Sequence, residues 1–124
     1  MMTTLIQIGI GGAIGAILRY LVNISSTHLL GTSFPYGTLF VNVVGSLLMG
    51  ILVTYFMNND QIAERFSPLI ITGFLGGFTT FSAFSNDTWQ LLNHSKIEWT
   101  LMYVFGSIIL SFGALILGIF IVKA

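Results

Sequence analysis

Residues 73–84 read Gly-Phe-Leu-Gly-Gly-Phe-Thr-Thr-Phe-Ser-Ala-Phe, inside a hydrophobic segment long enough to cross a bilayer. Glycine weakens a helix, and hydroxyl groups compete for its backbone hydrogen bonds. In lipid, a loosened backbone is tolerated only where protein buries it or where it lines a polar cavity. The stretch therefore predicts a transmembrane helix that is broken at mid-membrane, the position at which transporters and channels hold ions.

The composition around this stretch is that of an integral membrane protein. Hydrophobic residues make up 55% of the 124 residues and charged residues only 6%, whereas soluble domains carry about 25% charged residues. The net charge of zero gives no electrostatic case for nucleic acid binding. No cysteine is present, and no cluster of side chains suggests an enzyme's catalytic site.

Four spans of about 20 apolar residues each account for the whole chain as one all-α domain, residues 1–124. We expect a long loop after the first span. We also expect Pro68 in the first helical turn of the third span. The spans are predicted at residues 4–22, 36–57, 67–92 and 99–122.

The basic residues do not define an orientation in the membrane. With four spans both termini lie on one side, together with Arg65 and Lys123, while Lys96 and Arg19 lie toward the other side. Two basic residues against two give no preference by the positive-inside rule. Either a weak bias escapes so small a count, or the protein inserts in both orientations and pairs as an antiparallel dimer.

Polar groups inside the predicted spans are the candidate site. Thr38 and Asn42 share one face of the second span, where Asn42 is either an interhelical clasp or a donor to a small passing ligand. Phe81 and Phe84 share a face of the third span beside Ser82, and their positive ring edges can meet an anion. Loosened carbonyls near Gly76 and Thr79 would instead suit a cation such as Na⁺.

Two charged residues have several possible roles. Arg19 falls within about one turn of the predicted end of the first span, so it is either an interface anchor or part of an electropositive mouth. Asp87 lies about 8 Å inside the third span by helix rise. It could pair with Arg19, cap polar groups or face a water-filled vestibule.

Three motifs in order along the chain resemble the Fluc (CrcB-type) family of fluoride channels. They are Gly11-Gly12-x-x-Gly15-x-x-x-Arg19-Tyr20, Gly37-Thr38-Leu39-x-Val41-Asn42-x-x-Gly45 and Gly73-x-x-Gly76-Gly77-x-Thr79-Thr80-Phe81-Ser82-x-Phe84-Ser85. The resemblance implies a multi-pass protein of the cell membrane that exports fluoride passively and selectively. It also implies an antiparallel, dual-topology homodimer with two pores.

The resemblance also implies roles for individual residues. Asn42, Phe81 and Phe84 would line the fluoride pore, with Thr38, Ser82 and Tyr103 on a polar track beside them. The backbone carbonyls of Gly76 and Thr79 from both subunits would bind a structural Na⁺, and Arg19 would serve the vestibule. Two positions depart from the family pattern, because Ala83 stands where Thr is usual and Asp87 where Glu is usual.

One alternative comes from a different class, the small multidrug exporters, which also have four short spans and dual topology. Such exporters need a carboxylate deep in the first span, and residues 4–22 contain none. A membrane assembly protein without transport activity would have no use for the Gly-Gly break with its stacked hydroxyl groups.

Overall fold

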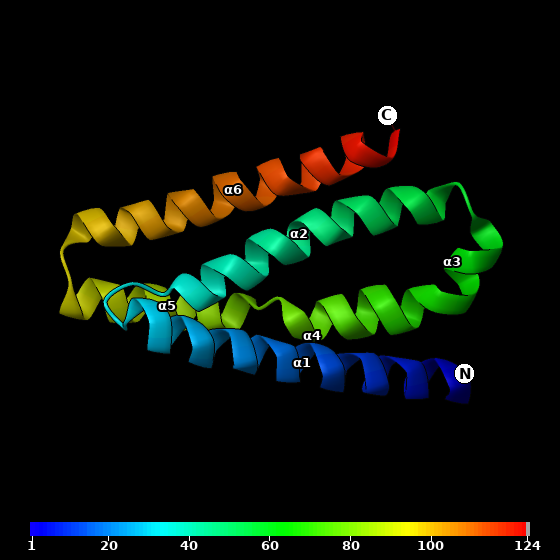
Figure 1. Ribbon diagram of the computed structural model, residues 1–124, viewed down its shortest axis with the longest axis horizontal. Coiled ribbons are helices and arrows are strands. Elements are labelled where there is room, and N and C mark those ends of the chain that lie inside the picture. Colours follow the sequence, from blue (N-terminus) through cyan, green and yellow to red (C-terminus); the bar gives the residue numbers. More distant parts are fainter. Residues whose placement is uncertain (124) are drawn as a thin grey trace.

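The computed structural model describes residues 1–123 and is helical almost throughout (Figure 1). Four segments are long and apolar enough to cross a membrane. The first two are α1 (Met2–Leu30) and α2 (Tyr36–Met57), and the last is α6 (Ile97–Lys123). Between α2 and α6 the third segment, Asp60–His94, consists of several consecutive pieces. Both ends of the chain lie at the same end of the molecule, as four spans require (Figure 1).

Glycines let the long helices approach each other backbone to backbone. A Cβ atom on Gly11 or Gly15 of α1 would collide with the backbone of Leu69 or Phe74 in the third segment. A Cβ atom on Gly118 of α6 would meet the backbone of Leu47 in α2. Small residues of this kind allow close packing where no hydrophobic effect drives helices together. Gly11, Gly15 and Gly118 thus lie where the long helices touch.

The third segment changes its helical form twice before it breaks. The chain runs through α3 (Asp60–Ser67), a π-helical stretch η1 (Pro68–Leu75) and α4 (Gly76–Phe78). Pro68 lacks an N–H group and its ring clashes with the carbonyl of the preceding turn, which explains why the helix widens there. Thr79 and Thr80 are extended (ψ 160° and 127°), and α5 (Phe81–His94) begins after them. The helix therefore breaks within the predicted stretch.

Two predictions about helix ends are wrong. The loop predicted from residue 23 is helical as far as Leu30, because Ser26 bonds back to the carbonyl of Asn23 within the turn and Gly37 packs against both side chains. The third segment starts before the predicted residue 67, because the amphipathic helix α3 precedes Pro68, which is itself the first residue of η1. The bounds of α2 agree with the prediction of residues 36–57.

The hydrophobic core is thin, and most of the large apolar side chains lie on the outside. Only six hydrophobic side chains are buried among the described residues: Val41, Phe56, Leu75, Phe78, Leu91 and Tyr103. Exposed apolar residues such as Ile109 (66%) and Phe120 (62%) cover α6. A helix that is apolar all round belongs in lipid. The fold is thus that of a multi-pass membrane protein.

Candidate functional site

The helix break is held by Asn42 of α2. Its side-chain Nδ2 donates to the carbonyl of Thr80 over 3.0 Å, and its Oδ1 accepts from the Thr80 N–H over 2.8 Å. The amide thereby replaces the backbone partners that the extended residue has lost. The interhelical clasp expected as one reading of Asn42 is present, and the second hydrogen on Nδ2 is left for another acceptor.

Arg19 of α1 holds the break from the other side. Its Nε donates to the carbonyl of Gly77 over 3.0 Å, and the side chain is half-buried. The prediction that Arg19 lies near the end of its helix is wrong, since α1 continues for eleven residues to Leu30, about 16 Å at 1.5 Å per residue. Of the partners considered for its side chain, Arg19 bonds the Gly77 carbonyl and not Asp87.

Two backbone carbonyls at the break lose their usual donors. In a continuous helix the Gly76 carbonyl would accept from Thr80 N–H, which here donates to Asn42. The Thr79 carbonyl would accept from Ala83 N–H, which here donates to Thr80 Oγ1 over 3.1 Å. Gly76 is also exposed, and only the Ile71 carbonyl oxygen, at 3.9 Å, lies near where its Cβ atom would be. These are the two carbonyls that the sequence suggests for a cation.

A groove of about 440 Å³ runs beside the break. Its polar lining comes from α2, α6 and the break itself, and its apolar lining includes Phe81 and Phe84. Ser107 of α6 also lines this groove; it is 6% exposed, and its Oγ has no hydrogen-bond partner among the described residues. A buried hydroxyl without a partner is unusual, and this one borders a groove from which a water molecule or an ion could supply the missing partner.

A chain of four aromatic rings runs from the groove to Phe34, in the loop between α1 and α2. The ring centroids of Phe81 and Phe84 are 5.7 Å apart, and those of Phe84 and Tyr103 are 5.2 Å apart. Phe34 then meets Tyr103 edge to face at 5.5 Å. Tyr103 is fully buried, so the phenylalanine pair and the predicted polar track join at this tyrosine.

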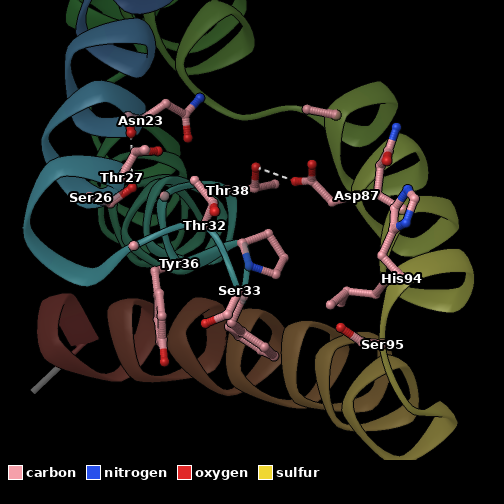
Figure 2. A pocket seen from close by; sticks show the side chains of 17 residues that line it. Asn23, Ser26, Thr27, Thr32, Ser33, Tyr36, Thr38, Asp87, His94 and Ser95 are labelled. Carbon is pink, nitrogen blue, oxygen red and sulfur yellow. Dashed lines mark hydrogen bonds between the residues drawn. The ribbon is translucent and has the colours of Figure 1, made fainter.

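A second, more polar chamber lies beyond Tyr103. Oδ2 of Asp87 accepts hydrogen bonds from Thr38 (2.6 Å) and from Tyr103 (3.3 Å). Asp87, Thr38 and Ala83 line a cavity of about 610 Å³ that also receives hydroxyl groups from α1 and from the loop after it. Figure 2 shows Asp87 reaching Thr38 across this cavity, with His94 farther along α5.

The structure thus distributes the predicted site residues over two connected places. Asn42, Phe81 and Phe84 meet at the groove, Thr38 lies at the chamber, and Tyr103 bridges them. Ser82 is exposed, with its Oγ 3.4 Å from Thr80 Oγ1. Sequence reasoning missed Ser107 and Ser111 as lining residues, because two serines four residues apart on an apolar helix are equally typical of close helix packing.

Fold and site together define a class, a multi-pass helical membrane protein with a groove beside a broken helix. The family model of the CrcB-like proteins, described as Camphor Resistance (CrcB), matches residues 6–119. The chain belongs to this CrcB family.

Curated relatives align with this chain over nearly its whole length. One from Nitrobacter winogradskyi is 43% identical over 98% of this chain and 96% of its own. Relatives from Cereibacter sphaeroides and Rhizobium meliloti are 45% and 42% identical, each over 99% of this chain and over 97% and 98% of their own lengths. All three are named fluoride-specific ion channel FluC. These names describe ion channels, in agreement with the prediction that this chain is not an enzyme.

Proposed function

We propose that this protein is a fluoride-selective channel that lets fluoride leave the cytoplasm passively and so relieves fluoride toxicity. The observation that carries the proposal is the groove in which two phenylalanine rings, the Asn42 amide and the unpartnered Ser107 hydroxyl meet. The names of the relatives agree with it.

The groove offers fluoride a partial replacement for its hydration shell. The free hydrogen on Asn42 Nδ2 and the hydroxyl of Ser107 are donors, and the ring edges of Phe81 and Phe84 carry a partial positive charge. Among the residues that line the groove there is no Lys, Arg or His. Donors without a full charge bind the anion weakly enough for it to leave, which a conducting pore requires.

The carbonyls of Gly76 and Thr79 fit a structural Na⁺. A hard cation prefers oxygen ligands, and both carbonyls lack their helical donors. Residues 1–123 contain no group of three or more His, Cys, Asp or Glu that could hold a metal ion. When bound, Na⁺ would supply a fixed positive charge that favours anions in the neighbouring grooves.

Two carbonyls are too few for one cation, which is a reason to propose an antiparallel homodimer with a second pair from the partner copy. The side of the break that a partner would cover is open, since Gly76 is exposed and Phe81 is 79% exposed. Arg19 is bonded to Gly77 inside the molecule and is left out of the count of basic residues on the two sides of the membrane. Arg65 and Lys123 then lie on one side and Lys96 on the other. A difference of one basic residue leaves the orientation weakly specified.

Fluoride efflux from liposomes containing the purified protein tests the channel, with chloride as the comparison ion. We expect fast fluoride efflux and no chloride efflux. Equal efflux of both ions, or none from well-folded protein, would refute the proposal.

Dual topology has its own test, because added charge fixes orientation. Lysines at Asn58 and Asn59, after α2, should bias insertion and impair transport. Normal activity from a chain shown to insert one way only would rule out the antiparallel dimer. The alternative of a multidrug exporter lacks support, since α1 carries no acidic residue along Met2–Leu30.

A further inference from the structure

We infer that Arg19 is a positioning residue, which holds the Gly77 carbonyl and thereby fixes the direction of the neighbouring Gly76 and Thr79 carbonyls. The inference rests on the proposed function, in which those two carbonyls bind Na⁺. It gives Arg19 a role at the centre of the molecule instead of at a vestibule.

The two residues before the break impose few conformational preferences of their own. Gly76 and Gly77 are consecutive, and glycine has the widest range of backbone conformations. Gly77 cannot carry a side chain, because a Cβ atom there would lie 2.5 Å from the carbonyl oxygen of Gly12. The close approach of α1 therefore requires a residue whose own conformational preferences do little to orient the adjacent carbonyls.

Arg19 compensates for this freedom. The Gly77 carbonyl is one of the unpaired acceptors at the C-terminal end of α4, where a positive group is also favoured by the helix dipole. The charged guanidinium bonds it over 3.0 Å, and such charge-assisted bonds are about twice as strong as neutral ones. Asn42 fixes Thr80 on the other side, and the Thr79 carbonyl belongs to the same peptide unit as the Thr80 N–H. The Gly76 carbonyl directly precedes the Gly77 unit that Arg19 holds.

If Arg19 acts by orienting the carbonyls, its removal has the opposite effect on Na⁺ binding from the effect expected if it acts only through its charge. If Arg19 acted only through its charge, its removal would relieve repulsion and tighten Na⁺ binding. If it orients the carbonyls, its removal must weaken Na⁺ binding. A purely structural role would lower stability equally at every Na⁺ concentration.

The test compares R19Q and R19K with the wild type by thermal unfolding in detergent over a range of NaCl, with ionic strength kept constant by N-methylglucamine chloride. We expect the midpoint of Na⁺ stabilisation to rise about tenfold in R19Q, which corresponds to about 1.4 kcal/mol, because glutamine cannot make the charge-assisted hydrogen bond. R19K should show a smaller rise. Q7A is the matched control, because Gln7 of α1 also donates to a backbone carbonyl, that of Arg65, far from the break; its midpoint should not move.

Three results would overturn the inference: an unchanged midpoint in R19Q, a lower midpoint in R19Q, or no Na⁺ response in the wild type. Should R19Q not fold, an unchanged midpoint in R19K overturns it equally. Fluoride efflux by the same wild-type preparation decides the channel proposal separately, because conduction can be present when the Na⁺ response is absent.

Discussion

The third segment has two halves that pack in different ways on either side of the break. Before it, η1 and α4 lie against the glycine face of α1, and Gly73, Leu75 and Phe78 are buried. After it, α5 has a single buried residue, Leu91, and Phe81 is 79% exposed. The first half is held by backbone contacts, and the second by hydrogen bonds from a few polar side chains.

This difference separates structural residues from candidate functional ones. Where backbones touch, no space remains for an ion, and a substitution acts on folding. Where side chains are loosely packed, the groove and the chamber open, and a substitution can act on transport while the fold persists. The predictions below test this division, from the largest expected effect to the smallest.

Gly15→Val should abolish folding, since it inserts a branched side chain into the contact between α1 and the first half. A Cβ atom there collides with Phe74 O and lies 2.8 Å from Phe78 N, so we expect a loss above about 3 kcal/mol. Size-exclusion chromatography in detergent would show aggregated or absent protein. Gly113→Val, where a Cβ atom meets nothing within 4 Å, is the control and should elute normally.

Phe81→Ile should lower fluoride flux about tenfold or more and leave the fold intact. The exposed ring contributes little to packing within the subunit, but an interaction of about 1.4 kcal/mol with the passing ion corresponds to a factor of ten. Efflux from liposomes and size-exclusion chromatography measure the two effects. Phe120→Ile, at a similarly exposed ring of α6, should conduct normally. Unchanged flux in Phe81→Ile would remove this residue from the pore.

Ser107→Ala should change stability and fluoride transport in different ways. Removing a buried hydroxyl that has no partner should leave the melting temperature unchanged or raise it, since such a group costs about 1–3 kcal/mol. The flux should fall several-fold if the hydroxyl meets the ion. Thr100→Val removes the other buried, unpartnered hydroxyl, which does not line the groove; its flux should not change. A loss of stability in Ser107→Ala with normal flux would contradict the assignment.

The sequence predicted the part of the third segment after the break better than the part before it. Polar residues in an apolar span are conspicuous because burying them is costly, so Asn42 and Thr79 could be singled out without a structure, and Phe81 and Phe84 through the hydroxyl groups among which they lie. Arg19 was misplaced because Asn23, Ser26 and Thr27 suggested a loop, and a sequence does not show which polar side chains bond within their own helix. Ser107 was missed because the sequence does not show whether a serine on α6 packs against another helix or lines a groove.

Ala83→Thr should give the smallest effect, a rise in fluoride flux of a few-fold at most. Ala83 lines the chamber beside Asp87 and Thr38, and its N–H is bound to Thr80 Oγ1, so the new hydroxyl would add one donor without disturbing the cap of α5. Ala83→Val has nearly the same shape without the hydroxyl and should not raise the flux. Equal gains from both variants would mean that side-chain volume, and not hydrogen bonding, limits passage through the second half. A gain from threonine alone would mean that a hydroxyl group in the chamber, as well as the donors of the groove, assists the passage of fluoride.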